Sequence, residues 1–263
     1  MPRLITAGVL LVVFVPTLFW APAGLWAALV ALVLALGGFE WGRIAGFSKP
    51  LAGVYGGALA GCALALHFLA GQKEFQHALL WAAVMFWALI APLWLARRWQ
   101  PRSPFALAMV GVIVLLPTWV ALVTLRDFGP WYLLGLLTVV WIADSAAFFV
   151  GRRFGSRKLA PAISPGKTWE GVAGAGVALL VYASAVSASI HGLRIAGALF
   201  LTLALFFFSV LGDLFESWMK RAAGLKDSGS ILPGHGGVLD RIDALTAALP
   251  IGTTILLVAG DRL

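Results

Sequence analysis

Residues 105–125 read FALAMVGVIVLLPTWVALVTL, a stretch of the chain without a charged side chain. A helix of this length, at about 1.5 Å per residue, can cross the ~30 Å hydrocarbon core of a bilayer. The whole chain has the same character, since 61% of its 263 residues are hydrophobic and 11% are charged. Soluble domains are about 25% charged. The sequence therefore predicts an all-α, polytopic integral membrane protein.

Similar apolar stretches recur along the chain and give about nine transmembrane helices. The expected spans are 4–20, 23–39, 51–70, 78–96, 105–125, 131–150, 171–190, 195–211 and 244–260. Span 171–190 is the weakest because it is rich in small and hydroxyl residues, although these also favour close helix packing in membranes. Span 4–20 has features of a signal peptide, but its long apolar stretch leads directly into another span, which favours a retained helix.

The positive charge of the chain follows this topology. Of the 19 Lys and Arg residues, 15 fall in the N-terminal segment and in alternate loops, and the other side receives only Lys73, Arg126, Arg194 and Arg262. By the positive-inside rule the N-terminus is cytoplasmic and the C-terminus is outside. The net charge of +8 thus needs no nucleic-acid partner. We expect a protein of the bacterial inner membrane whose active site faces the cytoplasm.

Polar chemistry is concentrated in residues 212–243, GDLFESWMKRAAGLKDSGSILPGHGGVLDRID. This segment combines acids, Lys and Arg residues, one histidine and a glycine-rich turn. Carboxylates suit Mg²⁺, Lys and Arg suit phosphate, and successive glycine amides can form an anion-binding concavity. The only cysteine, Cys62, lies in an apolar span, which excludes a disulfide framework and a thiolate metal site. The combination indicates a site for a metal–phosphate complex.

Asp144 forms a second candidate, near the inner end of span 131–150. It lies about seven residues before the expected end of its helix, and an acid at that depth is by default a functional candidate. The alternative is a packing acid paired with Arg152 or Arg153.

Residues 164–171, SPGKTWEG, form a third candidate. Lys167 is expected at a helix N-terminus, where free amides and the helix dipole favour anions. The glycine pattern of a P-loop is incomplete, so a P-loop is not predicted. The alternative is that Ser164 or Thr168 only caps the helix.

Four acids, Asp213, Asp240, Asp144 and Asp243, predict a magnesium site. Asp213 is expected to end the eighth span, whereas Asp240 and Asp243 begin the ninth span one turn apart. Crowded carboxylates need a cation, and oxygen ligands without thiolates favour Mg²⁺, with room for a second cation. The alternative is simple salt bridging to neighbouring Lys and Arg residues.

The glycines around His235 predict a phosphate-cradling turn, and the histidine itself is interpreted as a hydrogen-bonding or shape residue. Several other ionisable residues are interpreted as interface or loop residues: Glu40, His67, Glu74, His77, Asp127, His191 and Asp261.

The pattern S-x-x-K-R-x4-K-D-x5-P-G-H-G-G-x-x-D-R-x-D over residues 217–243 resembles the signature of the phosphatidate cytidylyltransferases, also called CDP-diacylglycerol synthases. Runs that begin at Asp144, Ser164 and Gly212 are similar to upstream elements of that family. The resemblance covers about the C-terminal half of the chain.

The resemblance implies that CMP is transferred from CTP to phosphatidic acid, giving CDP-diacylglycerol and pyrophosphate, with Mg²⁺ as cofactor. A homodimer is left open. The expected catalytic residues are Asp213, Asp240, Lys226, Asp227 and Arg241. The expected substrate-binding residues are Ser164, Lys167, Thr168, Ser217, Lys220, Arg221, Gly234, His235, Gly236 and Gly237. The expected metal ligands are Asp213, Asp240, Asp144 and Asp243.

The chain is expected to comprise an N-terminal region, 1–130, with helices 1–5, and a catalytic region, 131–263, with helices 6–9 and cytoplasmic loops 151–170 and 212–243. Two other functions remain open. A CTP-dependent polyprenol kinase would share the membrane, nucleotide and metal but would transfer the γ-phosphoryl group. An anion transporter would place ionisable residues near the bilayer midplane, between repeated halves.

Overall fold

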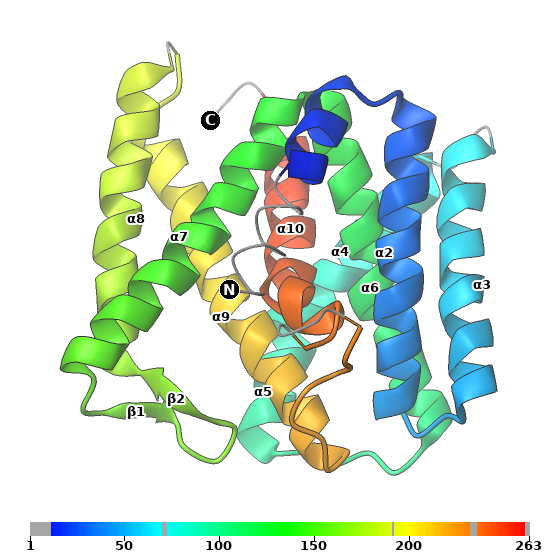
Figure 1. The fold of residues 1–263 in the computed structure, drawn as a ribbon. Coiled ribbons are helices and arrows are strands. Elements are labelled where there is room, and N and C mark those ends of the chain that lie inside the picture. The colour runs from blue at the N-terminus through cyan, green and yellow to red at the C-terminus, as the bar shows by residue number, and fades with distance from the viewer. Residues whose placement is uncertain (1–11, 70–72, 191, 232–235, 261–263) are drawn as a thin grey trace.

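The computed structural model describes residues 12–69, 73–190, 192–231 and 236–260. These residues form a bundle of long helices with one small antiparallel hairpin at its end (Figure 1). The elements are α2 (Ala23–Ile44), α3 (Lys49–Phe68), α4 (Lys73–Met85), the π-helical turn η1 (Phe86–Ile90), α5 (Ala91–Arg97), α6 (Pro104–Phe128), α7 (Pro130–Phe154), β1 (Lys158–Ala160), β2 (Ser164–Thr168), α8 (Trp169–Ser189), α9 (Ile195–Ala222) and α10 (Leu239–Ala259). A shorter helical segment, residues 12–20, precedes α2.

Within the described ranges, eight helices are long and apolar enough to cross a membrane, with α4, η1 and α5 forming one of them. They correspond to eight of the expected spans, and the remaining span, 4–20, is described only from residue 12. The predicted helical, polytopic membrane architecture is therefore confirmed. The all-α class omitted the hairpin β1–β2, whose strands are too short to show an alternating pattern.

Most of the helices extend beyond the expected boundaries, and four of these extensions bear on the site. α2 continues to Ile44, α7 continues to Phe154, α9 continues to Ala222 and α10 begins at Leu239. The prediction that Asp213 ends its helix was wrong, since Asp213 lies well inside α9. Hydropathy marks where apolar side chains stop, whereas Glu, Lys, Arg and Met beyond that point are themselves good helix formers. The connecting segments therefore shrink to residues 155–168 and 223–238.

Side-chain caps fix several helix starts. Ser103 accepts a hydrogen bond from the Ala106 amide, and Pro104 occupies the first turn of α6. Thr168 caps α8 by accepting a hydrogen bond from the Gly171 amide. These residues supply acceptors for amides that have no partner in the first helical turn.

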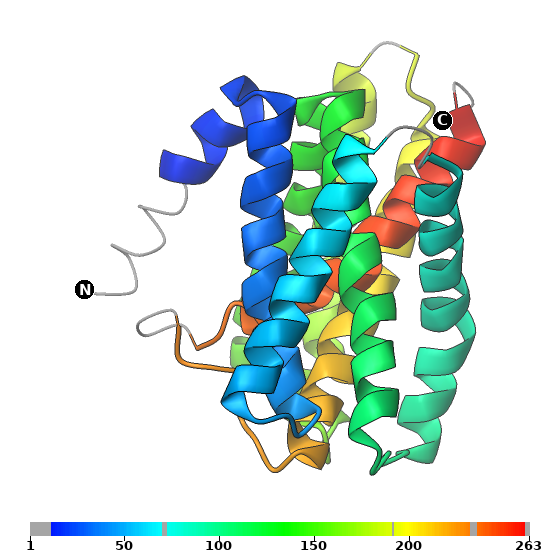
Figure 2. The same ribbon diagram turned by 90° about the vertical axis from the view of Figure 1, so that its right-hand side faces the viewer.

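The connections α2–α3, α5–α6, α7–α8 and α9–α10 all lie at the lower end of the bundle in Figure 1. The ends of α3, α6 and α8 and the starts of α4, α7 and α9 lie at the opposite end. α6 and α10 are the most buried helices, whereas α3 and α8 are the least buried. From the lower end of α9, the connecting segment folds back so that α10 begins inside the bundle (Figures 1 and 2). This return brings the first turn of α10 beside the polar half of α9.

Candidate active site

The close approach of α9 and α10 depends on Gly212. A Cβ atom at this position would lie 2.7 Å from the carbonyl oxygen of Asp243 and 3.1 Å from Cβ of Ala247. Real Cβ atoms do not approach backbone oxygen so closely, so a larger residue would separate the helices. Gly212 thereby brings the next residue, Asp213, up to α10.

Lys167 reaches Asp213 from the hairpin. The Lys167 Nζ atom lies 2.5 Å from Asp213 Oδ2, and both side chains are about one quarter exposed. The other oxygen of Asp213 accepts a hydrogen bond from Ser217 Oγ at 3.3 Å. The sequence placed these three residues in one site, and the structure brings them together.

Lys220 lies between two carboxylates inside the bundle. Its Nζ atom is 3.0 Å from Glu216 Oε1 and 2.5 Å from Asp240 Oδ1, and its side chain is only 9% exposed. Lys220 was predicted to bind substrate phosphate, but here its ammonium group joins α9 to α10. A buried ion pair of this kind depends on all of its partners, because removal of one leaves an uncompensated charge.

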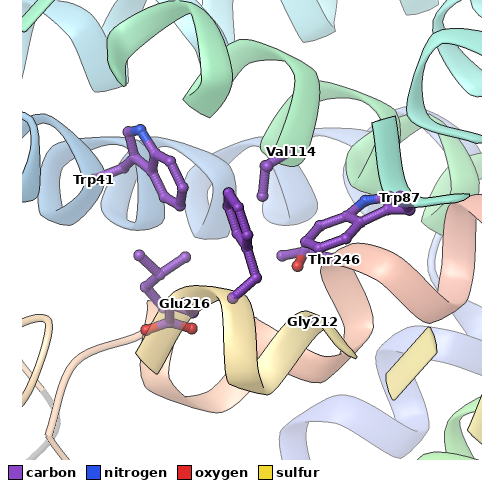
Figure 3. Close-up of a pocket in the computed structure, with 8 residues that line it drawn as sticks. Trp41, Trp87, Val114, Gly212, Glu216 and Thr246 are labelled. Carbon is purple, nitrogen blue, oxygen red and sulfur yellow. The ribbon is translucent and has the colours of Figure 1, made fainter. Parts of the chain in front are cut away.

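Glu216 is a buried acid to which the sequence assigned no role. Its contact with Lys220 is an ion pair by distance, but neither carboxylate oxygen has a hydrogen-bond partner among the described residues. Trp41, Trp87 and Thr246 line a narrow gap beside it, and the Glu216 carboxylate points away from the two indoles (Figure 3). The spacing of four residues between Glu216 and Lys220 was the available signal for this pair.

Asp240 organises the start of α10. It accepts hydrogen bonds from the amides of Ser228, at 3.0 and 3.2 Å, and Gly237, at 2.8 Å, in addition to the contact with Lys220. The amide of Gly237 was expected to face phosphate, but it donates to Asp240 instead. Both oxygens of Asp240 are therefore in use within the protein.

Glu40 of α2 approaches the same segment from the N-terminal half of the chain. Glu40 is only 1% exposed, and its carboxylate accepts hydrogen bonds from Ser228 Oγ and from the amides of Val238 and Leu239. The interpretation of Glu40 as an ordinary interface or loop residue was wrong. The only sequence signal was an isolated acid directly after the apolar span 23–39.

Asp144 and Asp243 complete the group of acids. The charges that act on Asp144 are those of Asp213, Lys167 and Arg241, and Asp144 is exposed on α7. The charges that act on Asp243 are chiefly those of Glu216 and Asp213. The four predicted metal ligands thus belong to one electrostatic group.

The remaining predicted residues lie around this group. Lys226, Asp227 and Arg241 are exposed, and Arg221 donates a hydrogen bond to the Leu225 carbonyl at 3.2 Å. Thr168 is buried as the cap of α8, and Ser164 begins β2. Gly236 has a φ angle of +83°, as expected for the glycine-rich turn. Gly234 and His235 lie outside the described residues.

The acids of this group are the residues that could hold the expected magnesium ion. In the part of the chain that the structure describes, no three His, Cys, Asp or Glu side chains are close enough together to hold a metal. The charges are nevertheless unbalanced, because five acids face three cations: Asp144, Asp213, Glu216, Asp240 and Asp243 against Lys167, Lys220 and Arg241. A divalent cation would offset this excess of negative charge. Asp213 and Asp144 are the accessible acids, so these residues fit the ion best.

The sequence matches the family model described as Cytidylyltransferase family over residues 1–259. A relative from Pseudomonas aeruginosa named phosphatidate cytidylyltransferase is 39% identical over 98% of this chain and 97% of its own length. A relative of the same name from Haemophilus influenzae is 36% identical over 94% of this chain and 95% of its own length. One from Bacillus subtilis is 40% identical over 57% of this chain and 59% of its own length. These matches confirm the resemblance and extend it over the N-terminal half.

Proposed function

This chain belongs to the cytidylyltransferase family, and we propose that it transfers CMP from CTP to phosphatidic acid, forming CDP-diacylglycerol and releasing pyrophosphate. The observation that carries this proposal is the location of the charged group. Phosphate-binding cations and carboxylates from β2, α7, α9 and α10 meet inside a bundle of membrane-spanning helices. The phosphate of a bilayer lipid and a water-soluble nucleotide can react only at a site that both can reach, where charged side chains border the membrane.

The proposed reaction requires little acid–base chemistry from the protein. A phosphate oxygen of the lipid forms a bond to the α-phosphorus of CTP, and the bond from that phosphorus to the β-phosphate oxygen breaks. The lipid phosphate is already an anion near neutral pH, so catalysis depends on positioning and on neutralising charge. Lys167 and Arg241 lie beside the accessible acids and are proposed to hold the phosphates. Lys226, exposed on the connecting segment, is proposed to contact the leaving pyrophosphate.

We assign Mg²⁺ to Asp213 and Asp144, with Asp240 and Asp243 as supporting acids. Mg²⁺, when bound, neutralises charge on the nucleotide phosphates. Lys167 now pairs with Asp213, and its flexible stem allows the ammonium group to move from the carboxylate to a phosphate. Asp240 keeps Lys220 and two backbone amides in place.

The active site is proposed to face the cytoplasm from a bacterial inner membrane. The α2–α3, α5–α6, α7–α8 and α9–α10 connections lie at one end of the bundle (Figure 1). Together with the helix turns beside them they carry 14 of the 19 Lys and Arg residues. The positive-inside rule places that end in the cytoplasm, where CTP is found. A ninth helix within residues 4–20 would put the N-terminus inside and the C-terminus outside.

The identity of the by-product tests the proposal. Purified protein in detergent is given CTP, Mg²⁺ and either phosphatidic acid or a polyprenol. We expect pyrophosphate with phosphatidic acid and no reaction with the polyprenol. Formation of CDP with the polyprenol would instead identify a kinase. Asp213→Asn should lower turnover by at least about 100-fold, the scale of a lost electrostatic contact to the transition state.

A further inference from the structure

We propose that Glu40 is a positioning residue that holds Ser228 against the start of α10 and thereby places the nearby Lys226 and Arg241 for binding CTP. This inference rests on the proposed function, because it concerns the nucleotide side of the same site. Glu40 belongs to α2, far from the sequence motifs that carry the family resemblance. Its role is indicated by contacts that only the folded chain creates.

The Glu40 carboxylate joins the two ends of the connecting segment. Oε2 accepts hydrogen bonds from Ser228 Oγ at 2.8 Å and from the Leu239 amide at 2.8 Å. Oε1 accepts a hydrogen bond from the Val238 amide at 3.0 Å. Ser228 lies near the start of the segment, whereas Val238 and Leu239 lie where α10 begins. One buried side chain therefore closes the loop.

Asp240 closes the same loop from the other side. It binds the Ser228 amide and the Gly237 amide, so Ser228 is held by both carboxylates, one through its hydroxyl and one through its backbone. Lys220 in turn holds Asp240. Two acids from different helices thus hold Ser228 against residues 237–239 at the start of α10.

Two glycines of this segment are explained by contact with Glu40. A Cβ atom at Gly229 would lie 2.9 Å from Glu40 Cδ, and one at Gly237 would lie 2.6 Å from the same atom. A Cβ atom at Gly237 would also collide with Ser228 Oγ. Neither glycine is needed here for a positive φ angle, since neither has one. Their small size lets the backbone close around the carboxylate.

Glu40 also occupies the N-terminus of α10. The amides of Val238 and Leu239 are among those that a helix leaves without an internal partner. A carboxylate at this position is stabilised by these donors and by the helix dipole. These two amides are consequently not available to a phosphate, so the proposed nucleotide contacts are made by side chains such as Lys226 and Arg241, which flank the residues that Glu40 holds.

Glu40→Gln tests this role because the amide keeps the shape of the side chain but places N–H groups against the donors. We expect hydrogen exchange at the backbone amides of residues 226–240 to accelerate at least about tenfold, as in a local opening. Exchange in the hairpin, residues 155–168, should be unchanged. We also expect KM for CTP to rise at least about tenfold while KM for phosphatidic acid stays within about twofold. Glu74→Gln, an exposed acid at the start of α4, is the matched control.

A second variant keeps the test decisive if Glu40→Gln does not fold. Ser228→Ala removes one of the three donors and should raise KM for CTP by a smaller factor in the same direction. In the double variant, Ser228→Ala should add little to Glu40→Gln, because the two residues share one interaction. Unchanged exchange in residues 226–240, or an unchanged KM for CTP, would overturn the inference. A wild-type protein that does not use CTP would refute the proposed function, and the exchange measurement would still decide whether Glu40 closes the loop.

Discussion

Lys220→Met is predicted to destabilise the protein more than any exchange of an exposed charge. Methionine fills nearly the same space as lysine but removes the ammonium group between Glu216 and Asp240. Asp240 would retain its two backbone donors. Glu216, 3% exposed and without a hydrogen-bond partner among the described residues, would lose its only ion pair there.

The size of the effect follows from burial. Removing one partner of a buried ion pair costs about 3–5 kcal/mol, because a charge remains without compensation. For a chain of this size, 1 kcal/mol shifts Tm by about 2–4 °C, so Lys220→Met should lower Tm by about 6–20 °C. Glu216→Gln removes the charge that Lys220 compensates. The double variant Lys220→Met/Glu216→Gln should therefore recover a large part of the lost stability.

Thermal unfolding in detergent, followed by tryptophan fluorescence, measures this directly. Lys226→Met is the matched control, because Lys226 is exposed on the connecting segment. It should change Tm by no more than about 2 °C, as expected for a surface substitution. An equal Tm for Lys220→Met and wild type would refute the reasoning. So would a double variant no more stable than Lys220→Met.

Two further predictions concern topology and the glycine-rich turn. The first uses a membrane-impermeant thiol reagent applied to intact cells that carry the protein in a Cys62→Ala background. Ser156→Cys, between α7 and β1, should resist the reagent, whereas Ser189→Cys at the far end of α8 should react. Labelling of Ser156→Cys from outside would reverse the proposed orientation. In the second, Gly236→Val should weaken CTP binding at least about tenfold, as measured by titration calorimetry. The φ angle of Gly236 is +83°, which disfavours a side chain, and a Cβ atom there would lie 2.7 Å from Asp240 Oδ2. Gly166→Ala, where a Cβ atom meets nothing within 4 Å, is the control, and equal losses in both variants would contradict the role of the turn.

The helices could be predicted from the sequence because a bilayer imposes a length and a composition on each span. Span 105–125 of the prediction and α6 (Pro104–Phe128) differ by only a few residues at each end. The polar half of α9 could not be predicted in this way. The apolar pattern stops before Asp213, but the helix continues. Asp213 and Glu216 are accommodated there because each pairs with a lysine, Lys167 and Lys220 respectively.

Contacts within the site could be predicted where the two residues are close in sequence, and could not be predicted where the residues are far apart. Asp213 and Ser217 lie one turn apart, and their contact follows from helical spacing. Glu40 contacts Ser228 and Leu239, which lie 188 and 199 positions away. No local pattern reports such a contact, because it depends on how α2 packs against the start of α10.

The transfer of CMP is tested most directly by CTP labelled at either the α- or the γ-phosphate. The purified protein is incubated with phosphatidic acid and Mg²⁺, and lipid and water-soluble products are separated. We predict that α-label enters the lipid and that γ-label appears only in pyrophosphate. Asp213→Asn should lower incorporation of the α-label at least about 100-fold. Recovery of γ-label in the lipid, with the α-label left in CDP, would contradict the account.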